Sequence, residues 1–157
     1  MGSVIKIEKG RISQREGVVL DNIDFELKSN EFVYLIGKTG SGKSSLLKTI
    51  YGELPISDGT GHVAGFDLSQ LRKKDVPMLR RKIGIVFQDF QLLSDRNVLK
   101  NLLFVLGATG WKDKSLMMTR AVEVLQLVGL ETKINSMPHA LSGGEQQMLT
   151  IGRALMT

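Results

Sequence analysis

Cysteine is absent from the 157 residues of this chain, which excludes a disulfide framework, a thiolate nucleophile and a cysteine-ligated metal centre. The two histidines, His62 and His139, lie too far apart to form a metal-binding spacing. Proline occurs three times, and no apolar run has the length of a membrane span or of a signal-peptide core. These absences favour a globular domain in the reducing cytoplasm.

What is present suits a folded domain with a sizeable core. Hydrophobic residues make up 42% of the chain and charged residues 24%, a balance typical of one globular domain or most of a larger one. The net charge of +5 would suit nucleic acid, a nucleotide or an anionic lipid. The densest basic cluster is LRKKDVPMLRRK at 71–82. The solvated face of a helix is the better explanation of most of these charges, so charge alone does not identify a ligand.

Three segments have the hydrophobic pattern of strands. Val18–Leu27 alternates apolar and polar residues, which is the pattern of a half-buried antiparallel strand. Glu31–Gly37 (EFVYLIG) and Ile83–Gln88 (IGIVFQ) are almost entirely apolar, which predicts strands buried on both faces, as in a parallel sheet.

Helices are predicted in the rest of the chain. Ser44–Leu54 has apolar residues at helical spacing, and Gly52 begins to break this helix. Leu71–Arg81 is predicted as a helix interrupted at Pro77. From Val98 the chain turns mostly helical, with Gly129 as a C-terminal cap of one helix. The last helix is expected to start at Ser142, with Glu145 completing a capping box.

The run GKTGSGKS (Gly37–Ser44) fits the phosphate-loop pattern G-x-x-x-x-G-K-[ST], between a predicted strand and a predicted helix. Its glycines allow backbone N–H groups to turn inward around an anion, and the helix that follows adds its positive end. Lys43 is expected to reach the β- and γ-phosphates, and Ser44 offers a hard oxygen ligand for Mg²⁺. The side chain of Lys38, at a variable position, is expected to be solvated. The loop alone does not decide among kinases, GTPases and ATPases.

A second run, LSGGEQQ (Leu141–Gln147), makes that choice. Together with the phosphate loop and Gln88 at the end of a predicted strand, it resembles the ATP-binding cassette (ABC) ATPases in motif order and approximate spacing. The resemblance covers essentially the whole chain. It implies an α/β P-loop NTPase fold with an antiparallel β-subdomain, a parallel-sheet core and a helical subdomain. Residues 1–157 would form one nucleotide-binding domain, with about 1–95 as the β-subdomain and core and about 96–157 as the helical part.

The resemblance also assigns roles, ATP and Mg²⁺ being the implied ligands. Gln88 would lie near Mg²⁺ and the attacking water, and Ser44 would also bind the metal. A head-to-tail homodimer would bring the signature of one copy to the nucleotide held by the other. The residues implied in nucleotide binding are Gly37, Lys38, Thr39, Gly40, Ser41, Gly42, Lys43, Ser44 and Ser45 and, from the second copy, Ser142, Gly143, Gly144 and Glu145.

Within the family, the stretch Lys74–Leu102 is similar to the FtsE-type cell-division subgroup, whose members work with the membrane protein FtsX. That similarity implies an ATP-binding subunit peripheral to the inner face of the membrane, with an FtsX-like permease docking near Asp89–Leu103. The alternative is the related group that serves lipoprotein-release and macrolide-export transporters. No nucleic-acid partner is expected, because chromosome-type members separate the two motifs by long coiled coils.

Two departures from the family pattern bear on activity. The aromatic residue that normally stacks on adenine would fall near Ser13, and no aromatic residue precedes Phe25; Ile12 or Arg15 would be the substitutes. The family's catalytic Asp-Glu pair and switch histidine would follow Thr157. We therefore expect this chain to bind nucleotide but to hydrolyse it poorly or not at all, and to self-associate through an uncovered sheet edge. A nucleotide-dependent adaptor without turnover is the alternative to an ATPase.

Overall fold

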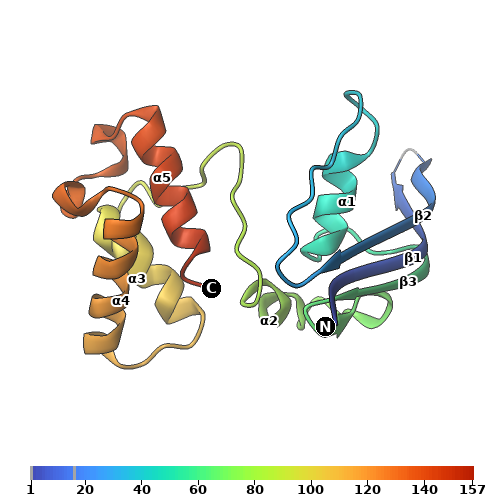
Figure 1. Ribbon diagram of the computed structural model, residues 1–157, viewed down its shortest axis with the longest axis horizontal. Coiled ribbons are helices and arrows are strands. Elements are labelled where there is room, and N and C mark those ends of the chain that lie inside the picture. The colour runs from blue at the N-terminus through green and yellow to red at the C-terminus, as the bar shows by residue number, and fades with distance from the viewer. Residues whose placement is uncertain (1, 16) are drawn as a thin grey trace. The chain divides into compact units, whose positions relative to one another are not determined.

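The computed structural model describes residues 2–15 and 17–157, which form two compact units. The N-terminal unit extends to Lys82, and the C-terminal unit comprises Ile83–Thr157. Figure 1 shows the strands in the first unit and the longer helices in the second. Each unit has its own core and is described separately.

The N-terminal unit is built on a four-stranded antiparallel sheet of order β2-β1-β3-β4. The two long strands, β1 (Ser3–Gln14) and β2 (Gly17–Lys28), form a hairpin, and the short β3 (Asp58–Val63) and β4 (Phe66–Asp67) extend the sheet from β1. In β2 every second residue from Ile23 to Leu27 is partly buried and the residues between them are exposed. The strand predicted at Val18–Leu27 is therefore confirmed.

Helix α1 (Lys43–Ile50) lies beside this sheet (Figure 1). It ends where Gly52 adopts a φ of 74°, which confirms the predicted break. The remaining short elements are the 3₁₀ turn η1 (Leu68–Gln70) and helix α2 (Val76–Arg80). The buried core of the unit contains Ile7, Ile12, Leu46, Ile50, Val63, Leu68 and Leu79.

The helix predicted over Leu71–Arg81 is correct only in its second half. Helix α2 begins at Val76, so Pro77 lies in its first turn and does not interrupt it. A proline is well tolerated there, because the N–H groups of the first turn have no partner within the helix.

The prediction of a buried strand at Glu31–Gly37 is wrong. The segment has no regular hydrogen-bonded structure and is exposed throughout, with Phe32 at 80% and Ile36 at 88% exposure. A strand of a parallel sheet is held by hydrogen bonds to its neighbours, and no residue in 2–15 or 17–157 supplies such a neighbour to this segment. The apolar sequence alone does not form the strand.

The C-terminal unit is a helical cluster of α3 (Val98–Ala108), α4 (Lys114–Leu127) and α5 (Gly143–Ala154). Two 3₁₀ turns, η2 (Glu131–Lys133) and η3 (Pro138–Ala140), connect α4 to α5. Gly129, with a φ of 69°, ends α4 as predicted. The core of this unit contains Val98, Leu102, Leu106, Ala121, Val124, Leu125, Leu130, Leu141, Leu149 and Met156.

The strand predicted at Ile83–Gln88 is also absent from the described structure. The segment is extended and partly exposed, with Val86 at 48% exposure, and it pairs with no strand among the residues that the structure describes. Within residues 2–15 and 17–157, the parallel-sheet core that the resemblance implies is therefore not formed, for the same reason as at Glu31–Gly37. No helix in the described part of the chain has the length and apolar character needed to cross a membrane.

Candidate nucleotide site

The phosphate loop is shaped by two glycines with left-handed backbone. Gly40 has a φ of 82° and Gly42 a φ of 87°. Gly42 is also the N-cap of α1, and no side chain caps this helix end. A Cβ on Gly42 would lie 2.7 Å from the side chain of Leu20, so both backbone angle and space require glycine here. The first N–H groups of α1 thus lack a side-chain acceptor, as an anion site requires.

The ammonium of Lys43 lies within this loop. Its Nζ donates to the carbonyl oxygens of Gly37 and Lys38, each at 2.7 Å, and more weakly to Oγ of Ser41 at 3.4 Å. A turn bond from the Ser41 N–H to the Lys38 carbonyl, 3.1 Å long, closes the loop. The positive charge is therefore held by three neutral oxygens of the loop itself, and Lys38 is exposed, as predicted.

The two serines after Lys43 have different environments. Ser45 is buried, and its Oγ accepts a 2.9 Å hydrogen bond from Nε2 of Gln14 at the end of β1. Ser44 is exposed at the start of α1. An Mg²⁺ ion bound to a nucleotide phosphate prefers oxygen ligands in an octahedral shell completed by water, and the exposed hydroxyl of Ser44 fits that requirement. No pattern in the sequence pointed to Gln14, because its role depends on a contact between two distant segments.

Two adjoining hollows lie beside the loop. The smaller, about 190 Å³, is lined by Gly40–Ser45 together with Gln14 and Val19. The larger, about 680 Å³, shares Gln14, Val19 and Gly40 with it and extends to Arg15, Gly17, Val18 and Leu54. No lining residue of either hollow is aromatic. Ile12 is fully buried and unable to contact a ligand there, so of the two expected substitutes only Arg15 remains.

The start of α5 is the second predicted anchor, and its capping box is confirmed. The Ser142 N–H donates to the Glu145 carboxylate at 2.8 Å, and the Glu145 N–H donates to Ser142 Oγ at 3.3 Å. A Cβ added to Gly143 or Gly144 would meet nothing within 4 Å. The two glycines therefore leave open space over a helix start whose first N–H groups have no partner within the helix.

The Glu145 carboxylate is engaged by its own chain. The Ser142 backbone N–H is the main cause that lowers the pKa of Glu145, with the Ser142 hydroxyl and the nearby Lys133 adding to it. Lys133 Nζ lies 3.5 Å from the carboxylate. A negative side chain is also a poor neighbour for a phosphate, so the helix start offers an anion its backbone rather than this side chain. The sequence did not indicate the Lys133 contact.

Gln88, the third predicted element, is exposed in the C-terminal unit. It precedes Phe90 and Gln91, two non-glycine residues with positive φ. Nearby, an open groove of about 460 Å³ is lined by Asp95, Arg96, Lys100, Leu103 and Phe104. The Arg96 guanidinium lies 4.7 Å from the centre of the Phe104 ring, a cation–π distance.

The loop beside this groove is fixed by Asn101, which is fully buried on α3. Its amide accepts from the Leu93 N–H and donates to the carbonyl oxygens of Leu93, Arg96 and Asn97. A buried amide with all these groups satisfied holds a loop firmly, since losing any partner would leave a polar group unpaired.

Comparison with known proteins agrees with the motif assignment. The model of the ABC transporter family matches residues 20–157. The chain is 42% identical over 137 residues to the cell division ATP-binding protein FtsE of Streptococcus pneumoniae, covering 87% of this chain and 59% of that protein. It is 41% identical over 138 residues to the methionine import ATP-binding protein MetN of Helicobacter hepaticus, covering 88% of this chain and 39% of that protein. The chain thus spans about three fifths of the length of the FtsE relative.

Solved structures give the same result. One chain of an ATP-binding cassette, from a dimeric post-hydrolysis structure with ADP and Pi, superposes with a TM-score of 0.86 at 31% identity, over 97% of this chain and 69% of that one. CbiO1 from Clostridium perfringens, part of the cbiONQ transporter complex, gives a TM-score of 0.87 at 28% identity, over 99% of this chain and 62% of that one. The predicted cassette fold is confirmed at the level of the chain trace.

Proposed function

Because this chain belongs to the ABC transporter family, we propose that it is the ATP-binding part of an ABC-type ATPase. The observation that carries the proposal is the phosphate loop, where left-handed glycines, an uncapped helix start and the Lys43 ammonium come together. On binding, Lys43 would exchange its carbonyl partners for phosphate oxygens, which make stronger charge-assisted bonds. The full protein would hydrolyse ATP, as the motif pattern of the family implies.

We place the nucleotide in the two adjoining hollows. The phosphates would occupy the smaller one against Gly40–Ser45, with Ser44 as a magnesium ligand. The family resemblance implies Gln88 as a further magnesium ligand. Bound Mg²⁺ would supply charge neutralisation for the phosphates. The base would enter the larger hollow, where Val18 and Val19 offer apolar surface and Arg15 a guanidinium that can stack on it.

We further propose a head-to-tail homodimer in which Ser142, Gly143 and Gly144 of each copy contact the nucleotide of the other, with Glu145 keeping that helix start in place. The open space over the two glycines supports this arrangement, and so does the dimeric state of the similar cassette with ADP and Pi. Residues 1–157 would belong to one nucleotide-binding domain, with the helical part from about residue 96.

The membrane partner that we propose is an FtsX-like permease acting in cell division, with this subunit on the inner face of the membrane. The similarity to FtsE supports it, and the groove at Asp95–Phe104, where a fixed loop meets exposed cationic and aromatic side chains, gives a surface suited to a helix of the permease. The second candidate is the corresponding subunit of a transporter, which the similarity to MetN favours.

The nucleotide-binding proposal is tested by calorimetric titration of Mg²⁺-ATP. Lys43→Ala is expected to weaken binding by at least about tenfold, since it removes a charge-assisted contact to phosphate. Lys38→Ala is the matched control, because it removes an exposed lysine from the same loop and should change the affinity little. Equal affinities of the wild type and Lys43→Ala would reject the proposal.

The partner proposal is tested by co-purification with the FtsX-like permease. Lys100→Glu reverses a charge in the groove and is expected to reduce recovery of the complex, whereas Lys112→Glu makes the same reversal at an exposed position outside the groove. A loss of recovery with both variants, or with neither, would count against this docking surface.

A further inference from the structure

The loop after Gln88 has a strained backbone that requires stabilising contacts from elsewhere in the fold. Phe90 and Gln91 have φ values of 59° and 46°, so two consecutive residues with a Cβ adopt the left-handed conformation. Such a conformation is unfavourable for any residue other than glycine and persists only where surrounding contacts impose it. The Gln91 N–H bonds to the Asp89 carbonyl at 2.6 Å, a local contact that tightens the turn but does not tie it to the fold.

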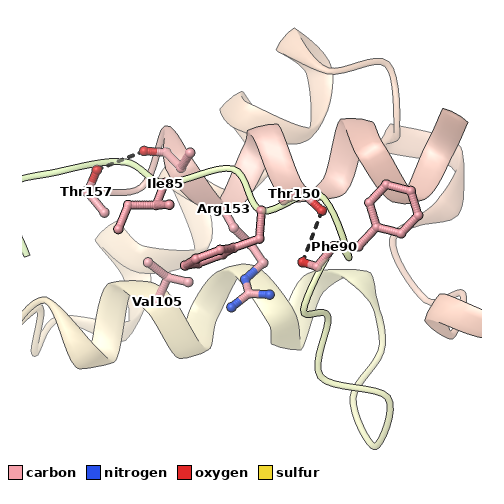
Figure 2. Close-up of a pocket in the computed structure, with 8 residues that line it drawn as sticks. Ile85, Phe90, Val105, Thr150, Arg153 and Thr157 are labelled. Carbon is pink, nitrogen blue, oxygen red and sulfur yellow. Dashed lines mark hydrogen bonds between the residues drawn. The ribbon is translucent and has the colours of Figure 1, made fainter. Parts of the chain in front are cut away.

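Helix α5 supplies the outside contacts. The guanidinium of Arg153 donates through Nη1 to the carbonyl oxygen of Gln91, and the Thr150 hydroxyl makes a longer, 3.4 Å contact to the carbonyl of Phe90. Figure 2 shows the Thr150 hydroxyl joined to the carbonyl oxygen of Phe90, with the Arg153 side chain beside them. Because Thr150 also bonds to the Gln146 carbonyl within α5 at 3.0 Å, Arg153 is the stronger tether of the loop.

The same helix also holds the segment before Gln88. A Cβ on Gly84 would lie 2.5 Å from the carbonyl oxygen of Ala154, so the chain passes against the end of α5 at a distance that only glycine allows. Gln88 is therefore flanked on both sides by contacts to one stretch of α5, at residues 150–154.

The surroundings of Arg153 are unusual for a structural arginine. It is half-buried, and burial lowers its pKa. Its Nε is buried and finds no hydrogen-bond partner within residues 2–15 and 17–157. It borders a cavity of about 120 Å³ lined also by Phe87, Phe90 and Val105 (Figure 2). The guanidinium charge of Arg153 is costly to bury. Its Nη1 nevertheless donates to the carbonyl oxygen of Gln91 in the strained loop.

We propose that Arg153 is a positioning residue for Gln88, and that α5 links the signature at its first turn to the Gln88 loop at its last turns. The capping box fixes the start of this helix, and its 12 residues give it a length of about 18 Å. When Ser142–Gly144 engages the nucleotide of a second copy, α5 carries that contact to Arg153 and sets the position of Gln88. The inference rests on the proposed roles of the signature and of Gln88.

The tether is tested first without nucleotide. The chain has no cysteine, so Asp89→Cys gives a single point for a nitroxide spin label, and Lys112→Cys gives a control point in the loop before α4. Arg153→Met is expected to make the label at position 89 more mobile and to leave the label at position 112 unchanged. Arg153→Lys, which keeps a donor, should retain most of the wild-type spectrum. An immobile label at position 89 in Arg153→Met would overturn the proposal.

A second variant guards against loss of folding in Arg153→Met. Proline fixes φ near −65°, so Gln91→Pro breaks the tether from the loop side and leaves α5 intact. It is expected to raise the mobility at position 89 with unchanged helix content by circular dichroism. An unchanged spectrum in this variant would equally contradict the proposal.

The link to the signature is tested by adding Mg²⁺-ATP. The label at position 89 should change its mobility in the otherwise wild-type chain but not in Arg153→Met. Gly144→Val should also abolish the change while leaving the nucleotide-free spectrum as it is, because nothing in this chain lies within 4 Å of an added Cβ. Failure of ATP to bind would reject the proposed function, whereas binding without a change at position 89 would reject the link alone.

Discussion

The two helix starts assigned to phosphate binding are built in opposite ways. Helix α1 begins at Gly42 without a side-chain cap, and its loop is shaped by left-handed glycines around the Lys43 ammonium. Helix α5 begins at Ser142 with both bonds of a capping box. At the start of α1, backbone N–H groups and the Lys43 ammonium are available to a ligand. At the start of α5, the side chains of Ser142 and Glu145 accept hydrogen bonds from the helix's own backbone.

The difference in capping suits the start of α1 to binding a phosphate and the start of α5 to holding its glycines in a fixed orientation. An uncapped helix start with a neighbouring ammonium gains most from a bound phosphate, since the ligand then supplies the missing acceptors. A capped start is stable without any ligand, so α5 presents Gly143 and Gly144 in a fixed place. In the proposed function, the first site would be completed by the nucleotide, and the second would be formed in advance for a nucleotide held by another copy.

The largest expected effect comes from replacing the glycine that shapes the first site. Gly42→Ala forces a Cβ into left-handed backbone, at a cost of about 1–2 kcal/mol, and against Leu20 at 2.7 Å. We expect the free energy of unfolding of the N-terminal unit to fall by roughly 2–3 kcal/mol and ATP binding to be lost. Denaturant titration and calorimetry measure the two effects.

Gly129→Ala is the matched control for that variant. Gly129 also has a positive φ, 69°, but nothing lies within 4 Å of an added Cβ. Its cost should be about 1 kcal/mol, with ATP binding retained. Equal costs for the two variants would show that the close approach to Leu20 has no energetic consequence.

A smaller effect is expected from removing the cap of the second site. Ser142→Ala removes the acceptor for the Glu145 N–H and should lower the stability of the C-terminal unit by about 1 kcal/mol. Ser44→Ala, at the start of the uncapped α1, should change stability by less than about 0.5 kcal/mol, because no cap is lost. Thermal unfolding measures the stability of both variants. A larger loss of stability in Ser44→Ala than in Ser142→Ala would contradict the comparison of the two helix starts.

The smallest effect is the pH dependence of the Glu145 cap. The pKa of this partly exposed carboxylate is lowered from its ordinary value of 4.5 in the folded protein, first by the Ser142 N–H. Its contribution to stability is therefore complete above the ordinary value and is lost as the pH falls through the lowered pKa. Glu145→Gln keeps an acceptor but does not titrate, so the wild type should lose its advantage over this variant as the pH falls from about 5 through the lowered pKa. A constant difference in melting temperature across that range would disprove the contribution.

The sequence allowed the prediction of features that depend on neighbouring residues. The capping box needs only Ser142 and Glu145, three positions apart, and the end of α4 at Gly129 needs only a glycine after a helical pattern. Phosphate-loop glycines are of the same kind, because the angles they permit are a local property. The structure confirms the capping box, the end of α4 at Gly129 and the left-handed backbone of Gly40 and Gly42.

Features that depend on distant partners were not predictable. Glu31–Gly37 and Ile83–Gln88 have the composition of buried strands, but strand formation requires a paired neighbour that composition does not report. The bond from Gln14 to Ser45 joins residues that lie 31 positions apart. The left-handed Phe90 and Gln91 are imposed by contacts with α5, and their identities give no sign of it.

The exposed run Phe32–Ile36 has a consequence for the synthesis of the protein. It is an apolar, uncharged segment of strong strand formers without proline, which is the composition of segments that stack into cross-β fibrils. None of the described residues after it supplies a strand that pairs with it. During synthesis, this exposed run can therefore pair edge to edge with the same run of another nascent copy.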